Sequence, residues 1–138
     1  MRNGSEVKIR SQFIPNLCSE IIIIMPQIVK IGKELVCVNP SRNTIDYSTS
    51  DGRTWMVRYS NSGIGKVMDL LYFKDELLLV TSKGLYYSHS QGRTWTMRYN
   101  NNSNFDFLGL AESGSTLLAT TSKGLYYSNS QGRTWLKR

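Results

Sequence analysis

Arginine is the residue type in this sequence whose repetition most directly suggests chemistry. Two series of three arginines recur every 40 residues, and a tyrosine, Tyr59 or Tyr99, directly follows two of them. A guanidinium group offers paired donors to a carboxylate, sulfate or phosphate, so a ring of such groups could bind an anionic ligand. Arginine stems also stack on aromatic rings for structural reasons alone, and the sequence leaves both interpretations open. The two series are Arg53, Arg93 and Arg133, and Arg58, Arg98 and Arg138.

Side chains that could catalyse a reaction are few and scattered. Asp75 and Glu76 form the one adjacent acidic pair, and we expect them in a solvated turn because residues 113–116 are Ser-Gly-Ser-Thr in the next copy. His89 corresponds to Asn129, which indicates a turn residue rather than a base. Glycoside hydrolysis needs two placed carboxylates, and no pair in the sequence stands out for that role. The sequence therefore predicts no catalytic residue.

Cysteine usage indicates neither a metal site nor a disulfide framework. The two cysteines, Cys18 and Cys37, form no CxxC pair of the kind that binds zinc. Cys37 lies in the apolar stretch of residues 35–38, where a cysteine is most often a small buried hydrophobe. We expect no metal and no cofactor, and whether the two thiols are bridged stays open.

One phrase, repeated three times, contains most of these residues. Residues 81–95 and 121–135 differ at a single position, and residues 41–55 are a looser copy. Each copy ends in a tryptophan, and these tryptophans are 40 residues apart. A fixed period of this length is typical of propellers and other repeat arrays. The tryptophans are Trp55, Trp95 and Trp135.

Each 40-residue copy is predicted to form four short antiparallel strands separated by Gly, Asn and Ser turns. Four such strands make one blade of a β-propeller, so the predicted fold is all-β with about three blades. In the second copy the strands are expected at residues 67–73, 76–81, 85–88 and 95–99. We divide the chain into a non-repeated N-terminal strand segment, residues 1–26, and three repeats at about residues 27–66, 67–106 and 107–138.

The end of each phrase resembles the Asp-box, or bacterial neuraminidase repeat, whose usual form is Ser-x-Asp-x-Gly-x-Thr-Trp. One departure recurs, because serine replaces aspartate in all three copies. In the turn, glycine supplies a positive φ and the serines accept backbone hydrogen bonds, which suits a structural hairpin staple. The matching residues are Ser48, Ser50, Gly52, Thr54 and Trp55; Ser88, Ser90, Gly92, Thr94 and Trp95; and Ser128, Ser130, Gly132, Thr134 and Trp135.

The resemblance implies a β-propeller and suggests two kinds of activity. Sialidases of this family use an arginine triad, a tyrosine nucleophile assisted by glutamate, and an acid/base aspartate, and none of those motifs can be matched here. Asp-box propellers are also similar to photosystem II assembly factors and sorting receptors, which bind proteins without catalysis. We therefore predict a non-catalytic binding or scaffold propeller that presents its arginines and tyrosines to a protein or an acidic glycan. The alternative is a sialidase-like glycoside hydrolase fragment.

The number of blades raises the question of ring closure, because propellers usually contain about four to eight blades. Three repeats indicate either a fragment of a longer protein or closure by self-association, and we expect the latter. A dimer would supply six blades, or seven with residues 1–26. The net charge of +7 would suit an anionic partner, but we interpret it as a general basic surface and do not expect nucleic acid to be the ligand. No stretch is long enough to span a membrane, and the sequence does not specify a compartment.

Overall fold

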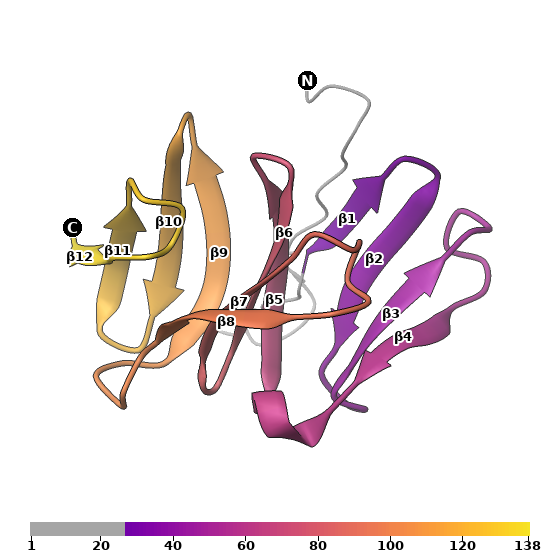
Figure 1. Cartoon of the computed structure of the whole chain (residues 1–138), viewed down its shortest axis with the longest axis horizontal. Coiled ribbons are helices and arrows are strands. Elements are labelled where there is room, and N and C mark those ends of the chain that lie inside the picture. Colours follow the sequence, from indigo (N-terminus) through magenta and orange to yellow (C-terminus); the bar gives the residue numbers. More distant parts are fainter. Residues whose placement is uncertain (1–26) are drawn as a thin grey trace, which may run out of the picture.

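The computed structural model describes residues 27–138, which form three four-stranded antiparallel sheets, each with its strands in sequence order (Figure 1). The first sheet contains β1 (Ile28–Ile31), β2 (Glu34–Asn39), β3 (Thr44–Ser48) and β4 (Met56–Ser60). The second contains β5 (Val67–Phe73), β6 (Glu76–Thr81), β7 (Gly84–Ser88) and β8 (Thr96–Asn100). The third contains β9 (Phe107–Ser113), β10 (Thr116–Thr121), β11 (Gly124–Ser128) and β12 (Leu136–Lys137).

The all-β, propeller-like arrangement predicted from the repeat is confirmed. Within residues 27–138 the only helical element is the 3₁₀ turn η1 (Ser62–Ile64), which lies in the connection between the first two sheets. No helix in this part of the chain has the length and apolar character to cross a membrane. The strand and cysteine expectations for residues 1–26, including Cys18, lie outside the described residues.

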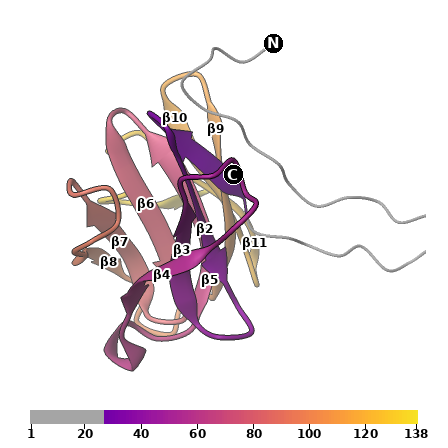
Figure 2. The ribbon, with the colours of Figure 1, turned by 90° about the vertical axis from the view of Figure 1, so that its right-hand side faces the viewer.

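The sheets lie side by side like adjacent blades, and the middle sheet is covered on both faces (Figures 1 and 2). Every residue of β6 is buried, which explains why its sequence is a continuous apolar run rather than an alternating one. In the outer sheets, β2 and β10 alternate between more and less buried positions. A strand with only one covered face needs apolar side chains at every second position.

Two hydrophobic seams hold the three sheets together, and each buries one face of the middle sheet. The first seam packs Val36 and Ile45 of the first sheet against Leu70 and Leu79 of the second. The second seam includes Leu78 and Leu85 of the second sheet with Phe107, Leu117 and Trp135 from the third repeat. Burial of this apolar surface is the main favourable term that keeps the blades in contact.

A buried carboxylate connects β5 with β9 and with Gln27, the residue directly before β1. Asp69 is 1% exposed and accepts hydrogen bonds from the backbone N–H groups of Gln27 and Leu110, both at 2.9 Å. The Gln27 side chain also donates to Asp69 at 3.3 Å and to the Leu110 carbonyl oxygen at 2.9 Å. Backbone donors compensate the cost of burying this polar side chain, and they fix the spacing of β5, β9 and the start of β1.

Candidate functional site

Three loops with the repeated serines and glycine join the third and fourth strands of each sheet. In the middle loop, the Ser88 hydroxyl accepts hydrogen bonds from the N–H groups of Ser90 (3.2 Å) and Gly92 (2.9 Å). The Ser90 hydroxyl accepts from the Thr94 N–H, and Trp95 Nε1 donates to the Gly92 carbonyl, both at 2.9 Å. The other two loops repeat these bonds at 2.8 to 3.2 Å. We call residues 48–55, 88–95 and 128–135 the box loops.

Each box loop turns through two successive residues with positive φ. The glycines have φ values of +88°, +94° and +92° in chain order. The residues before them, Asp51, Gln91 and Gln131, have φ values of 61°, 60° and 58°. Glycine adopts this conformation at low cost, whereas glutamine does so with strain. The hydroxyl and indole hydrogen bonds of the loop compensate that strain.

The box tryptophans differ in exposure according to whether another sheet precedes them. Trp135 packs into the second seam, with its ring 5.4 Å from the Phe107 ring, and is 8% exposed. Trp95 packs against the first seam and is half-buried. Trp55 belongs to the first sheet and is 36% exposed. A tryptophan at the end of a box loop therefore covers the preceding sheet where one is present.

Arg58 and Arg98, two of the predicted ligand-binding arginines, are buried in internal clamps. Arg58 holds Glu34 through both terminal nitrogens, at 2.6 and 2.8 Å, and its guanidinium carbon lies 3.9 Å from the centre of the Tyr47 ring. Arg58 Nη1 also donates to the carbonyl of Gln91 in the next box loop, at 3.1 Å. The Arg58 side chain is only 4% exposed. This guanidinium group is therefore occupied within the protein.

Arg98 repeats the arrangement one sheet further along the chain. It contacts Glu76 at 2.6 and 2.8 Å, covers the Tyr87 ring at 4.1 Å, and donates to the Gln131 carbonyl at 3.2 Å. Stacking of arginine on an aromatic ring, the structural interpretation of these residues, is thus present for Arg58 and Arg98, with tyrosine as the ring. The interpretation of Glu76 as part of a solvated turn is wrong. Glu76 begins β6 and is buried, whereas its neighbour Asp75 is exposed in the turn.

Arginine contacts shift the acidity of both glutamates. The hydrogen bonds from Arg58 lower the pKa of Glu34 below its ordinary value of 4.5, although burial partly opposes this. The pKa of Glu76 is lowered in the same way by Arg98, and His89 contributes through its contact at 2.8 Å. The ion pairs also raise the pKa values of Arg58 and Arg98. Both clamps are therefore charged at neutral pH.

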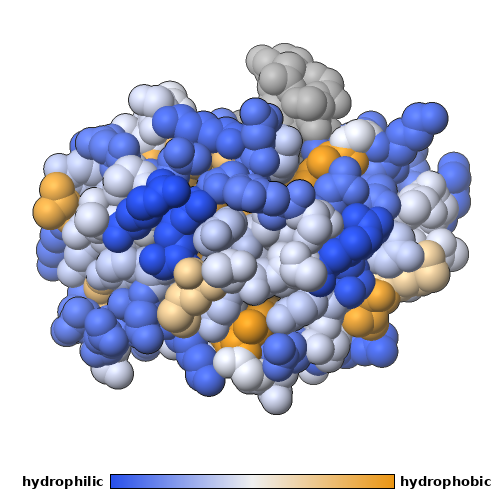
Figure 3. Space-filling model, in the orientation of Figure 1, coloured by the Kyte–Doolittle hydropathy of each residue, from blue (hydrophilic) through white to orange (hydrophobic). Residues whose placement is uncertain are grey.

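Arg53, Arg93 and Arg133 lie differently, because they are exposed at the tips of the box loops. Each donates from Nη1 to the carbonyl of the serine three positions earlier, at 3.4, 3.2 and 3.1 Å respectively. Arg93 also donates to the side-chain oxygen of Gln91. Figure 3 shows one face of the surface, where hydrophilic side chains dominate and hydrophobic residues form separate patches. These three cations are thus directed to solvent in the same way in every repeat.

Arg138 shares features with both groups. Its guanidinium carbon lies 4.6 Å from the centre of the Tyr127 ring, as the clamps require. The position of Glu34 and Glu76 is occupied by Thr116 in this sheet, and the Thr116 hydroxyl donates to the Asn129 side chain at 2.9 Å. Arg138 is exposed. The third clamp therefore has its ring and its cation but lacks the carboxylate.

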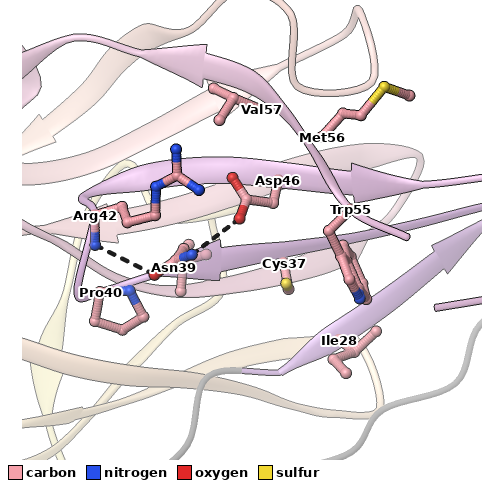
Figure 4. Close-up of a pocket in the computed structure, with 10 residues that line it drawn as sticks. Ile28, Cys37, Asn39, Pro40, Arg42, Asp46, Trp55, Met56 and Val57 are labelled. Atoms are coloured by element: carbon pink, nitrogen blue, oxygen red, sulfur yellow. Dashed lines mark hydrogen bonds between the residues drawn. The ribbon is translucent and has the colours of Figure 1, made fainter. Parts of the chain in front are cut away.

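The outer face of the first sheet contains a cavity of about 440 Å³ (Figure 4). Trp55 and Ile28 line one part of it, and Arg42 and Asp46 another. The Asp46 carboxylate accepts hydrogen bonds from Asn39 Nδ2 at 3.0 Å and from the Thr44 hydroxyl at 2.6 Å. The polar groups that line this cavity are thus largely hydrogen-bonded to one another, and the rest of the cavity wall is apolar.

A second, smaller cavity of about 210 Å³ lies between the first two sheets and is lined partly by Tyr72, Asp75 and His89. His89 is exposed and contacts Glu76, as a turn residue can. No group of three His, Cys, Asp or Glu side chains within residues 27–138 is placed to hold a metal ion. The buried carboxylates of Asp46, Asp69 and Glu76 each accept hydrogen bonds from their own surroundings. They do not form an opposed pair across either cavity.

Comparison with known proteins supports the fold but does not identify a family. No protein-family model matches the sequence, and no curated protein matches it. Among solved structures, an ancestral GH74 enzyme, a β-propeller-type glycoside hydrolase, aligns with a TM-score of 0.56 at 12% sequence identity. The alignment covers 75% of this chain but only 16% of the enzyme. At such low identity the likeness shows the fold alone, and the Asp-box resemblance stays a prediction.

Proposed function

We propose that the chain is a non-catalytic propeller-type binding or scaffold module whose box arginines hold an anionic partner. The observation that supports this most directly is the repeated exposure of Arg53, Arg93 and Arg133, each of which donates a side-chain hydrogen bond to the same serine carbonyl of its own loop. A cation that is pre-positioned in this way loses little conformational freedom when it binds a carboxylate or sulfate. Arg58 and Arg98 contribute by keeping adjacent sheets, and hence the arginine tips, in register.

An anionic glycan is the ligand class favoured by this arrangement, and an acidic protein surface would present similar groups. Sulfates and carboxylates recur at regular intervals along such polymers. The arginines also recur along the row of sheets, so several weak contacts can act together in one bound chain. Each contact is exposed and screened by salt, so affinity depends on the number of arginines engaged.

The test measures binding of the full-length chain to heparin and to poly-glutamate by calorimetry at about 0.15 M salt. A variant with Arg53, Arg93 and Arg133 replaced by glutamine is expected to bind at least about tenfold more weakly than the wild-type chain. The matched control replaces Lys33, Lys66 and Lys123 by glutamine, which removes the same charge from exposed sites elsewhere. An equal loss in the control would show attraction by net charge alone and would contradict the proposal.

A glycoside hydrolase fragment is the second candidate, and its support is the likeness to the GH74 enzyme. In that case the reacting carboxylates would have to lie outside the hydrogen-bonded set of Glu34, Asp46, Asp69 and Glu76, because each of these is held internally. Turnover of a fluorogenic sialoside, or release of reducing ends from a polysaccharide panel, would favour this candidate over the binding module.

A further inference from the structure

The two outermost sheet faces carry the two halves of one more seam. We propose that the outer face of the first sheet binds the outer face of the third sheet of a second copy of this chain, and that two copies close a ring through two such seams. In each seam, Arg138 of one copy pairs with Asp51 of the other. This inference does not depend on anion binding by the box arginines.

The two seams inside the chain are built from equivalent positions. In the first, Leu70, Leu79, Tyr86 and Trp95 of the second repeat pack against Val36 and its neighbours in the first sheet. In the second, Leu110, Ala119, Tyr126 and Trp135 of the third repeat pack against the second sheet. Strand register shows that the two sets are equivalent. Leu70 lies opposite Leu79 in the second sheet, and Leu110 lies opposite Ala119 at the same place in the third sheet. One face of each sheet is therefore specialised to cover the sheet before it.

The outer face of the first sheet carries the same specialised positions, and within residues 27–138 no other sheet lies against it. Ile28 pairs with Cys37, so these residues correspond to Leu70 and Leu79. Together with the exposed Trp55 they line the cavity of about 440 Å³. This apolar wall is half of a seam.

The outer face of the third sheet carries the other half. Leu118 and Leu125 correspond to Leu78 and Leu85, which are fully buried in the second seam. Leu125 is instead 39% exposed, and Leu118 helps to line a mainly apolar cavity of about 160 Å³. An apolar surface of this kind on both ends of one molecule favours contact between copies.

Polar contacts across the seams define how the two halves would meet. Arg58 donates to the carbonyl of Gln91, and Arg98 donates to the carbonyl of Gln131, in each case across a seam to the next box loop. In a third seam of this geometry, Arg138 would donate to the carbonyl of Asp51. The apolar contact and this polar contact therefore select the same register.

The distribution of acidic residues supports the same pairing. In both seams inside the chain, the sheet supplies a glutamate to its arginine and the next box loop supplies a glutamine. At the open ends Thr116 replaces that glutamate, and Asp51 replaces that glutamine. Each of the two seams inside the chain thus pairs its arginine with one carboxylate from the sheet. In the proposed seam, the carboxylate that pairs with Arg138 is Asp51 of the first box loop. This charge complementarity between the two ends of one chain favours a second copy as the occupant.

The ring size also favours two copies. The described part of each copy, residues 27–138, contributes three sheets, so two copies make six, which lies within the usual range of about four to eight blades. The Asp46 carboxylate, which enters the proposed seam, keeps the hydrogen bonds from Asn39 and Thr44 and so remains satisfied on burial. A head-to-tail contact of this kind is closed when the rotation between copies completes the ring.

Light scattering on the full chain at micromolar concentration tests the proposal. The expected mass is twice the 15.7 kDa of one chain. The variants D51R and R138E should each be monomeric, with dissociation constants raised at least about tenfold. An equimolar mixture of the two variants should dimerise again, because one seam then contains the exchanged charges and the other contains the original pair. Recovery on mixing also shows that both variants are folded.

The controls D75R and K66E make the same charge reversals at exposed positions away from both open faces, and they should remain dimers. A wild-type chain that stays monomeric, or that forms a larger assembly, overturns the two-copy ring. Dimeric single variants, or variants that fail to associate on mixing, overturn the pairing of Asp51 with Arg138. Loss of heparin binding in the box-arginine variant with an unchanged dimer mass would separate this inference from the proposed function.

Discussion

Arg98 holds Glu76 through both terminal guanidinium nitrogens, at 2.6 and 2.8 Å, and its guanidinium carbon lies 4.1 Å from the centre of the Tyr87 ring. The two side chains are only 5% and 10% exposed. The pair is therefore largely removed from water, and its attraction must offset a considerable desolvation cost. The contact from Arg98 to the Gln131 carbonyl satisfies a further donor and connects the pair to the next sheet.

Removing one partner of this pair should destabilise the fold strongly. We expect Glu76→Gln to lower the free energy of unfolding by about 3 kcal/mol, because the Arg98 charge stays buried without its carboxylate. The double variant Glu76→Leu with Arg98→Met should lose much less, since neither charge remains. Urea titration measures both values. A single variant as stable as the wild type would show that water or another residue replaces the carboxylate.

Acid should weaken the protein through the same glutamates. The pKa values of Glu34 and Glu76 are lowered in the folded state, so the folded protein binds fewer protons than the unfolded chain near their ordinary value of 4.5. Their contribution to stability is fully present above that value and is lost as the pH falls through the folded-state pKa values. Stability measured by urea between about pH 3 and 7 should decline below about pH 5.

A variant without the two glutamates is the control for this pH dependence of stability. Glu34→Gln combined with Glu76→Gln removes both titrating groups, so the decline on acidification should be shallower than in the wild-type chain. An unchanged slope would assign the acid sensitivity to carboxylates other than Glu34 and Glu76.

The sequence predicted the blades well but not the clamps. Strands follow from local patterns, and β6 was expected at the residues where it occurs, 76–81. The contact between Glu76 and Arg98 spans 22 residues. The residues next to Glu76 in the sequence form a polar turn, and this local pattern alone predicts that Glu76 is exposed to solvent. The sequence does contain a signal for the clamps: the first two repeats share both partners. Glu34 and Glu76 begin equivalent strands, and Arg58 and Arg98 follow equivalent tryptophans. Only the register of the sheets shows that these positions meet.

Other parts of the site have no clear local signature. Asp69 lies in an apolar strand, and its partners Gln27 and Leu110 are about 40 residues away on either side, so its role depends on three sheets at once. The positive φ of Gln91 is also unexpected from sequence, because glutamine has no side-chain preference for that conformation. Both features are imposed by the surrounding structure.

Restoring aspartate in a box loop should stabilise it. The Ser90 hydroxyl accepts a hydrogen bond from the Thr94 N–H at 2.9 Å, and a carboxylate there would make a stronger, charge-assisted bond. We expect Ser90→Asp to raise the free energy of unfolding by about 0.5–1 kcal/mol and Ser90→Ala to lower it by about 1 kcal/mol. Thermal unfolding of the wild type and the two variants measures the order of their stabilities. A Ser90→Asp variant less stable than the wild type would contradict the prediction.

Two box glycines should differ in their tolerance of a methyl group. Gly92 and Gly132 have nearly the same φ, +94° and +92°, so alanine is strained equally at both. A Cβ at Gly132 would overlap Leu85, which is packed in the second seam, whereas a Cβ at Gly92 meets no atom closer than 3.5 Å. Gly132→Ala should therefore cost about 1 kcal/mol more than Gly92→Ala. Urea unfolding of both variants tests this, and equal losses would show that Leu85 moves aside freely.

Cys37 should be a slow nucleophile despite lying beside a cavity. Burial raises its thiol pKa to about 11, and the Asp46 carboxylate adds to the shift. Because the thiolate is the reactive form, alkylation at pH 8 should be roughly a hundredfold slower than for a thiol titrating near 9. The rate with iodoacetamide should keep rising about tenfold per pH unit up to about pH 10 without levelling off.

The measurement needs Cys18→Ser, so that Cys37 is the only thiol, and Asp51→Arg, so that the self-association proposed above adds no further burial. Adding Asp46→Asn to this background should increase the rate modestly, because it removes the smaller of the two causes and leaves burial in place. Circular dichroism at each pH checks that the chain stays folded. A rate that levels off near pH 9 would show that water reaches the sulfur, and hence that the outer face of the first sheet is more open than its apolar wall indicates.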